Sequence, residues 1–197
     1  SPTQEQRQAI DHVTASDRFE VFLLEGVTGS GKTEVYLQSM APVLAAGKQV
    51  LVLVPEIALT PQTLARFEKR FGSTGMIHSA LTDQQRLQTW LRCRSGDIRI
   101  LIGTRSAVFT PFKELGLIIV DEEHDSSYKQ QEGLRYSARD LTVKRAQSLG
   151  IPLLLGSATP SLESFYNVQR GRYRHLTLSE RAGGALMPTY HTIDLRG

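Results

Sequence analysis

Residues 20–33 read EVFLLEGVTGSGKT, and this stretch decides the fold class. An apolar run of strand length, residues 20–25, leads into residues 26–33, which match the phosphate-loop pattern G-x-x-x-x-G-K-[ST] at every fixed position. In such a loop the glycines let successive backbone N–H groups turn toward an anion, and the dipole of the following helix adds to that field. The stretch predicts a nucleotide site in an α/β domain, and the alternative is a glycine-rich turn that binds no ligand.

Within this loop two side chains have predicted roles of their own. Lys32 would reach the β- and γ-phosphates, and the hydroxyl of Thr33 would ligate Mg²⁺. The remaining loop positions would surround the phosphates through the backbone. The predicted ATP contacts are Gly26, Val27, Thr28, Gly29, Ser30, Gly31, Lys32 and Thr33.

A second cluster of polar residues follows a buried apolar run, in LIIVDEEH at residues 117–124. In parallel α/β sheets, ligands bind at the carboxyl ends of the strands, beside the phosphate loop. Asp121 is therefore the predicted Mg²⁺ holder, and Glu122 is predicted to orient and deprotonate the attacking water. Glu123 is predicted to be a surface charge or an indirect neighbour of this site, and the alternative for all three acids is a solvated strand end.

The rest of the chain repeats the pattern of short apolar runs and longer amphipathic stretches. Continuous apolar runs are typical of parallel strands that are covered on both faces. The order predicts a mainly parallel sheet with helices on both faces. Predicted strands are residues 20–25, 49–54, 76–78, 98–102, 115–121 and 152–155, and predicted helices are residues 3–13, 32–46, 61–71, 82–94, 137–149 and 160–168.

Composition narrows the class of protein. The chain has 197 residues, a net charge of +3 and one cysteine, Cys93, which excludes an internal disulfide and predicts no zinc site. We find neither an apolar run long enough for a membrane span nor a signal peptide, so we expect a cytoplasmic protein with no membrane partner.

Residues 1–197 are predicted to be one domain cut from a longer protein. Residues 172–197 are predicted to form edge strands, at 173–178 and 190–195, or a connection to the next domain.

Several segments together resemble superfamily-two helicases of the DExH type. The phosphate loop, DEEH at residues 121–124 and GSAT at residues 156–159 resemble motifs I, II and III of that family. VPEIALT at residues 54–60 and GTRS at residues 103–106 look like motifs Ia and Ib. Residues 3–10 resemble the adenine-reading glutamine motif, in which Gln6 is the best match.

Within that family the chain resembles the bacterial primosomal helicases, and the resemblance covers essentially the whole chain. It implies a RecA-like P-loop NTPase domain that uses ATP and Mg²⁺, and it implies that this is the first helicase lobe alone. The complete helicase would unwind forked DNA in the 3′ to 5′ direction at stalled replication forks and assemble the primosome. Implied partners are the single-stranded tracking strand, the remaining domains of the helicase, primosome proteins and single-strand binding protein.

The same resemblance implies roles for further residues. His124, Ser157 and Thr159 would couple hydrolysis to DNA, although a lone histidine beside acids can also be a structural hydrogen-bonder. Residues 125–136 would form an aromatic-rich loop that senses DNA, with Leu134 where members of the family carry Trp; the alternative is an ordinary surface loop. The alternative for Arg105 is a plain surface charge. The implied DNA contacts are Pro55, Thr60, Thr104, Arg105, Tyr128, Lys129, Arg135 and Tyr136.

Two other classes of function fit parts of the pattern. The lobe could be a docking module for DNA or protein partners, in which nucleotide only stabilises the fold. It could also be a P-loop ATPase that moves no nucleic acid, although the GSAT segment and the loop at residues 125–136 disfavour that class. Because a helicase of this type needs an arginine from a second lobe, the isolated lobe is expected to be weakly active or inactive.

Overall fold

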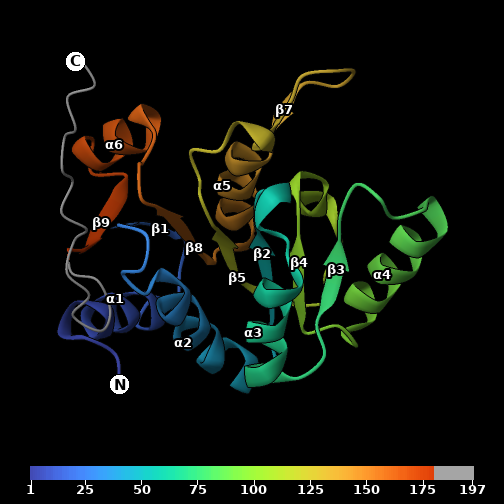
Figure 1. The fold of residues 1–197 in the computed structure, drawn as a ribbon, viewed down its shortest axis with the longest axis horizontal. Coiled ribbons are helices and arrows are strands. Elements are labelled where there is room, and N and C mark those ends of the chain that lie inside the picture. The colour runs from blue at the N-terminus through green and yellow to red at the C-terminus, as the bar shows by residue number, and fades with distance from the viewer. Residues whose placement is uncertain (180–197) are drawn as a thin grey trace, which may run out of the picture.

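The computed structural model describes residues 1–179, and Figure 1 shows their fold. Seven strands form one parallel sheet in the order β3-β4-β2-β5-β8-β1-β9. The strands of this sheet are β1 Glu20–Gly26, β2 Gln49–Leu53, β3 Gly75–Ile77, β4 Ile100–Gly103, β5 Leu115–Val120, β8 Pro152–Ser157 and β9 Tyr173–Leu178. The helices are α1 Gln4–Thr14, α2 Lys32–Ala45, α3 Pro61–Phe71, α4 Asp83–Ser95, α5 Ala138–Leu149 and α6 Leu162–Gln169.

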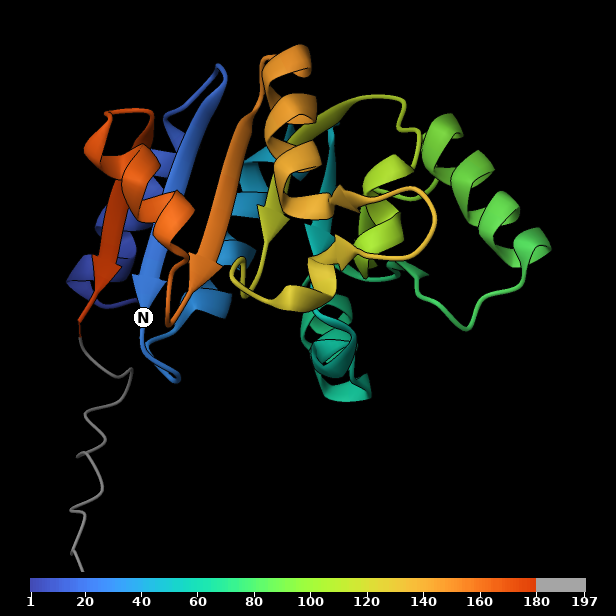
Figure 2. The same ribbon diagram turned by 90° about the horizontal axis from the view of Figure 1, so that it is seen from above.

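Helices cover both faces of the sheet. In β1, Phe22 and Leu24 belong to the core shared with α1, α2 and α3, whereas Val21 and Leu23 belong to the core shared with α4, α5 and α6. Figure 1 shows α1, α2 and α3 below the sheet and α5 and α6 above it, and Figure 2 views the same layers from above. Because both faces of the sheet are buried, the residues that point to either face are apolar. The sequence of a strand is therefore a continuous apolar run.

Local signals define the helix ends. Thr3 caps α1 through a capping box with Gln6, and Thr82 caps α4 in the same way. Pro61 opens α3, and Gly72 with a φ of 83° ends it. The ends of the predicted helices and strands agree with the structure to within about two residues. The predicted strand at 173–178 is β9, which pairs in parallel with β1, while the one at 190–195 lies outside the described residues.

Residues 125–136 are more ordered than the loop that the sequence predicts. They include the short 3-10 turn η3 Ser126–Tyr128 and the first strand of an antiparallel hairpin, β6 Lys129–Gln130 with β7 Tyr136–Ser137. Figure 1 shows this hairpin projecting beyond the end of α5. Two further 3-10 turns follow strands of the sheet, η1 Glu56–Ala58 after β2 and η2 Arg105–Phe109 after β4. Among residues 1–179, every helix is too short or too polar to cross a bilayer.

One edge of the sheet gathers the segments of interest. Because the strands are parallel, whatever follows them lies at their common carboxyl edge. The phosphate loop follows β1, Pro55 follows β2, Thr104 follows β4, Asp121 follows β5, and Ser157 ends β8.

Candidate active site

The phosphate loop is built for a bound anion. Gly29 and Gly31 have φ of 85° and 88°, a region that glycine adopts without steric cost. The backbone N–H groups of Gly29, Gly31, Lys32 and Thr33 donate to no backbone acceptor within residues 1–179. The Ser30 hydroxyl is buried and also lacks a partner among the described residues. A row of unsatisfied donors at the start of a helix fits a polyphosphate.

Lys32 and Gly26 shape the loop around these free N–H groups. Lys32 is 9% exposed, and its ammonium donates to the Gly26 carbonyl at 2.5 Å, so the charge already lies inside the loop. A Cβ on Gly26 would lie 2.4 Å from the Ser30 hydroxyl, so a side chain at this position would require Ser30 to move. The loop therefore brings the predicted phosphate-binding lysine to the same place as the free N–H groups.

Gln6 lies against the loop from the side of α1. Its amide nitrogen donates to the Ser30 carbonyl at 2.8 Å, and its amide oxygen accepts from the backbone N–H of Thr3 at 3.0 Å. At 3% exposure the side chain connects the helix cap to the phosphate loop. Contact between Gln6 and adenine stays a prediction.

Asp121 is held by two tyrosine hydroxyls. The Tyr36 hydroxyl donates to Asp121 Oδ1 at 2.7 Å, and the Tyr128 hydroxyl donates to the Asp121 backbone carbonyl at 2.5 Å. Tyr36 is four residues after Lys32 on α2, on the same face of the helix. Sequence reasoning missed Tyr36, and this spacing from the loop lysine was the available signal.

The two predicted catalytic acids differ in setting. Burial raises the pKa of Asp121 above its usual value, against the opposing effects of the Tyr36 hydrogen bond and the Lys32 charge. Burial and the neighbouring Asp121 also raise the pKa of Glu122, which makes it a stronger base. Glu122 has a φ of 47°, an unusual conformation for a residue with a side chain, and such strain is concentrated at functional sites. Thr33 and Asp121 are the residues that would hold Mg²⁺.

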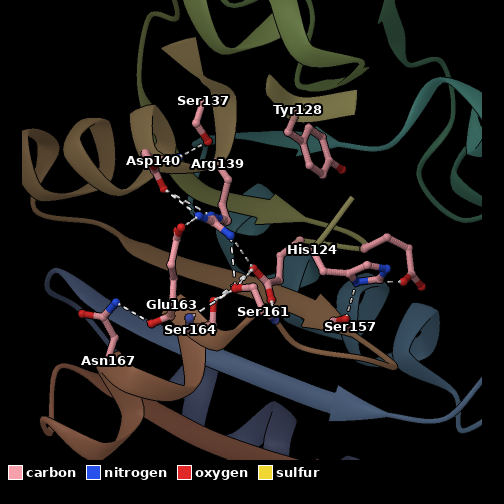
Figure 3. Close-up of polar contacts among 12 residues, drawn as sticks. His124, Tyr128, Ser137, Arg139, Asp140, Ser157, Ser161, Glu163, Ser164 and Asn167 are labelled. Atoms are coloured by element: carbon pink, nitrogen blue, oxygen red, sulfur yellow. Dashed lines mark hydrogen bonds and ion pairs between the residues drawn. The ribbon is translucent and has the colours of Figure 1, made fainter. Parts of the chain in front are cut away.

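The three predicted coupling residues lie together. His124 Nδ1 is 2.6 Å from the Ser157 hydroxyl and 3.6 Å from Glu122 Oε2, and the Thr159 N–H donates to the same hydroxyl at 2.9 Å. Figure 3 shows the His124 ring beside Ser157. The contact between the DEEH and GSAT segments is therefore present, and its coupling role stays a prediction.

Glu123 was predicted to be either a surface charge or an indirect neighbour of the site. The first of these is wrong, because the carboxylate is 1% exposed. Its oxygens accept hydrogen bonds from the Ser161 N–H at 2.7 Å, the Ser164 hydroxyl at 3.0 Å and the Arg139 guanidinium at 3.2 Å. Figure 3 shows Arg139 between this group and the acids Asp140 and Glu163. The partners lie 16 to 41 residues away in sequence, so the acidic cluster alone gave no signal for them.

A cavity lies along the same edge, beside residues 54–60 and 103–106. It has a volume of about 350 Å³, and its lining includes Glu56, Thr104, Arg105, Leu134 and Tyr136. The Thr104 hydroxyl donates to Glu56 Oε1 at 3.4 Å, and Tyr136 packs edge-on against Phe109. The structure thus brings together predicted DNA contacts from two separate segments. Glu56 is a lining acid that sequence reasoning did not single out.

The remaining predicted DNA contacts divide into exposed and buried residues. Lys129 and Arg135 are exposed and line a further hollow of about 400 Å³ on the hairpin. Thr60 is half-buried and caps α3. Pro55 is buried, and Thr104 is 4% exposed, so we do not retain a side-chain contact to DNA for either.

The prediction that Tyr128 contacts DNA is wrong. Its ring is 1% exposed and packs in the core between the sheet and α5, so it cannot stack on a base as predicted. Aromatic residues in a polar, glycine-containing loop suggested an exposed surface, but the 3-10 turn directs this ring inward. Its hydroxyl instead supports Asp121.

These features define the class: a RecA-like P-loop domain with a phosphate loop, a half-buried carboxylate and a histidine hydrogen-bonded to a serine at one edge of a parallel sheet. The chain belongs to the DEAD/DEAH box helicase family, whose model matches residues 3–168. Domains of this family use a nucleotide and Mg²⁺ in ATP-dependent helicase activity.

Particular relatives share much more of the sequence. The chain is 58% identical over 194 residues to the replication restart protein PriA of Haemophilus influenzae, and 49% identical over 198 residues to that of Bacillus subtilis. Each match covers 98% of this chain but only 27% and 25% of those proteins, so the chain spans about a quarter of their length.

Solved structures agree with the fold. RecG bound to a three-way DNA junction matches with a TM-score of 0.68 and 26% identity, over 94% of this chain and 25% of that one. The yeast DEAD-box splicing factor Prp28 matches with a TM-score of 0.63 and 17% identity, over 93% of this chain and 47% of that one. At the lower identity the likeness concerns the fold alone.

Proposed function

We propose that residues 1–197 form a single ATP-binding lobe of a replication-restart DNA helicase. The lobe binds ATP with Mg²⁺ at the phosphate loop and contacts a DNA strand along the neighbouring part of the same edge. The observation that carries this proposal is a connection between the two places. Arg105 hydrogen-bonds to the residues on both sides of Tyr128, and the Tyr128 hydroxyl hydrogen-bonds to the Asp121 carbonyl.

Arg105 hydrogen-bonds to the backbone on both sides of Tyr128. Its Nη1 donates to the carbonyls of Ser127 at 3.2 Å and Lys129 at 3.3 Å, and the Tyr128 hydroxyl reaches the Asp121 carbonyl. A phosphate that drew the Arg105 guanidinium away would release these carbonyls and loosen the support of Asp121. Occupation of the DNA edge would thereby reach the nucleotide site, and this connection disfavours a docking module with an unrelated nucleotide.

At the nucleotide site the chemistry is divided among residues already placed. The loop N–H groups and Lys32 bind and orient the phosphates. Mg²⁺, when bound with the nucleotide, neutralises phosphate charge, and Thr33 and Asp121 would hold it. Glu122 orients the attacking water and takes its proton, which the raised pKa of its carboxyl favours. His124 relays the state of this site to Ser157 and Thr159 through their shared hydrogen bonds.

On the DNA edge, Arg105 and the exposed hairpin cations Lys129 and Arg135 contact the sugar–phosphate backbone, as do Tyr136 and Thr60. Such contacts carry no sequence preference, which suits a protein that tracks along a strand. Unwinding in the 3′ to 5′ direction, primosome assembly and contact with single-strand binding protein belong to the proposed complete helicase, which acts in the cytoplasm. That helicase adds an arginine from a second lobe, an effect of roughly 10³–10⁵ in rate in related systems.

ATP turnover by the 197-residue chain tests the proposal, measured with and without a forked DNA. Glu122→Gln serves as the blank, and single-strand binding is measured in parallel for Arg105→Ala, with Arg94→Ala on α4 as the matched control. We expect slow turnover that DNA does not raise, and DNA binding that weakens for Arg105→Ala only. Fast, DNA-stimulated turnover that is lost in the blank would contradict the single-lobe proposal, and equal DNA binding by both variants would contradict the placement of the DNA edge.

A further inference from the structure

A hollow lies between α2 and α3, next to the phosphate loop. Both helices lie on the same face of the sheet (Figure 1). The volume of the hollow is about 600 Å³, and its lining residues are Thr33, Glu34 and Leu37 from α2 and Arg66, Lys69 and Arg70 from α3. Thr33 belongs to both places, because it also ends the phosphate loop and carries one of the free backbone N–H groups there. The hollow therefore adjoins the nucleotide site at a residue proposed to hold Mg²⁺.

The charges of this lining are mainly positive. Three cations from α3 accompany a single acid, Glu34. Arg66 and Lys69 are exposed, and neither forms an ion pair within the part of the chain that the structure describes. An excess of unpaired positive charge around a hollow attracts an anionic group.

The one acid of the lining is already engaged. Glu34 Oε1 accepts a hydrogen bond from the Gln38 side-chain amide at 2.6 Å and lies 3.5 Å from Arg70 Nη1. Glu34 therefore offsets the charge of Arg70, and the charges of Arg66 and Lys69 remain available to a ligand.

The shape and chemistry of the lining favour a small anion. Arg66 and Lys69 are three residues apart on α3, so they lie on one face of the helix and reach the hollow together. Leu37, at 7% exposure, adds an apolar surface from α2. Among the described residues that line the hollow, none is aromatic, so a base would find no ring to stack on. The site thus suits a phosphate group more than a nucleoside.

We propose that this hollow binds inorganic phosphate, the product that leaves the nucleotide site after hydrolysis. The inference rests on the proposed function, because it needs ATP to be hydrolysed at the phosphate loop. In that reaction the oxygen of water bonds to the terminal phosphorus, the proton of water passes to Glu122, and the bond between that phosphorus and the ADP oxygen breaks. ADP stays on the loop N–H groups, whereas the freed phosphate leaves on the side of Thr33 and pairs with Arg66 and Lys69. A phosphate group carries a charge of about −1.5 at pH 7, which two free cations balance.

A DNA strand is the main competitor for these cations. α3 begins after its N-cap Thr60, which is one of the proposed DNA contacts. Arg66 and Lys69 follow later on the same helix, but they share their hollow with α2 and with the loop residue Thr33. This position on the side of the nucleotide favours the product of hydrolysis over the DNA backbone.

Phosphorus NMR of inorganic phosphate with the 197-residue chain tests the proposal, because the phosphate line broadens when the ion exchanges with the protein. The chain is first saturated with Mg²⁺ and a non-hydrolysable ATP analogue, a step that isothermal titration checks, so that the loop and the terminal phosphate position are already filled. The test variant is Arg66→Gln with Lys69→Gln. Arg92→Gln with Arg94→Gln, two exposed positions on α4, is the control with the same change in net charge. Single-stranded and duplex DNA serve as competitors.

We expect phosphate to bind the analogue-loaded chain, and its dissociation constant to rise about tenfold in the α3 variant and to stay unchanged in the α4 control. Analogue binding should be the same in all three proteins, and thermal unfolding checks that each is folded. Equal phosphate binding by the two variants would overturn the proposal. So would phosphate binding that the analogue abolishes, since the ion would then occupy the loop itself.

The remaining outcomes separate DNA and nucleotide from the product. If DNA displaces the phosphate and the α3 variant also binds DNA about tenfold more weakly, the hollow belongs to the DNA edge and the assignment to the product is wrong. DNA that leaves the phosphate signal unchanged supports the assignment. Failure of the analogue to bind the folded wild-type chain would overturn the proposed function, and this inference with it, whereas analogue binding without phosphate binding would overturn this inference alone.

Discussion

The Tyr36 hydroxyl donates a 2.7 Å hydrogen bond to Oδ1 of Asp121, a residue 85 positions later in the chain. Tyr36 lies on the helix that begins at the phosphate loop, and Asp121 follows a central strand of the sheet. The bond therefore fixes the carboxylate proposed to hold Mg²⁺ relative to the loop proposed to hold the phosphates. Tyr36 is 2% exposed, so no water competes for its hydroxyl from bulk solvent.

Tyr36→Phe should keep the ring packing but release the carboxylate. A hydrogen bond to a charged group contributes about 1.5–3 kcal/mol, so we expect Mg–ATP to bind about tenfold more weakly or worse. Isothermal titration with a non-hydrolysable ATP analogue and Mg²⁺ measures this. Tyr166→Phe on α6, where the side chain is 53% exposed, is the matched control. Equal affinity in both variants would show that Tyr36 only fills space.

Gly156 should tolerate no side chain while Tyr36 is present. A Cβ at this position would lie 1.7 Å from the Tyr36 hydroxyl and 2.8 Å from the adjoining ring carbon. Gly156→Ala should therefore displace the tyrosine, lower the melting temperature and weaken nucleotide binding. Combining it with Tyr36→Phe removes the nearest atom, so the double variant should be more stable than the sum of the two single effects predicts. Strict additivity in thermal unfolding would contradict this contact.

Asp121→Asn should stabilise the chain in the absence of nucleotide. Burial raises the pKa of Asp121 in the folded chain above its unfolded value, so the folded state loses stability as the pH rises through that range. Asparagine stays neutral and keeps an oxygen for Tyr36. The variant should thus melt at a higher temperature than wild type at pH 7, and the difference should disappear toward the unfolded value of 3.8. Asp97→Asn, at an exposed position, is the control, and a pH-independent difference would be the contrary result.

Glu123→Gln should destabilise the fold more than it alters chemistry. Arg139 is only 9% exposed, and Asp140 and Glu163 still pair with it after the change, so we expect a loss of about 1–3 kcal/mol, the cost of leaving buried hydrogen-bonding groups unsatisfied. Denaturant unfolding gives the loss directly. Glu163→Gln removes another carboxylate on the same guanidinium, but its side chain is 65% exposed, so its effect should be about 1 kcal/mol or less. A smaller loss for Glu123→Gln than for Glu163→Gln would contradict the buried network.

The sequence predicted the sheet and the phosphate loop well because both depend on local pattern. Continuous apolar runs, capping residues and the loop glycines each act within a few residues of where they stand. The roles of Tyr36, Glu123 and Tyr128 depend instead on partners brought close only by the fold. Glu123 in an acidic run looks solvated until Arg139 and Ser161 are packed over it.

Tyr128 shows the same limit, because the sequence predicts an exposed ring and the fold buries it. Its neighbours Lys129 and Arg135 are exposed as predicted, and the polar sequence around it predicts exposure for the ring too. The 3-10 turn that starts after Asp125 reverses the direction of this one side chain. Composition describes a segment as a whole, whereas burial is decided residue by residue.

Binding of Mg–ATP to the wild-type chain and to Lys32→Ala tests the central claim most directly. The account predicts that wild type binds and that the variant, shown to be folded by its thermal unfolding, loses binding by at least about tenfold, because Lys32 is the only charge placed inside the phosphate loop among the described residues. Lys144→Ala, at the opposite edge of the sheet, should bind as wild type does. Equal affinity in wild type and Lys32→Ala would contradict the assignment of this loop as the nucleotide site.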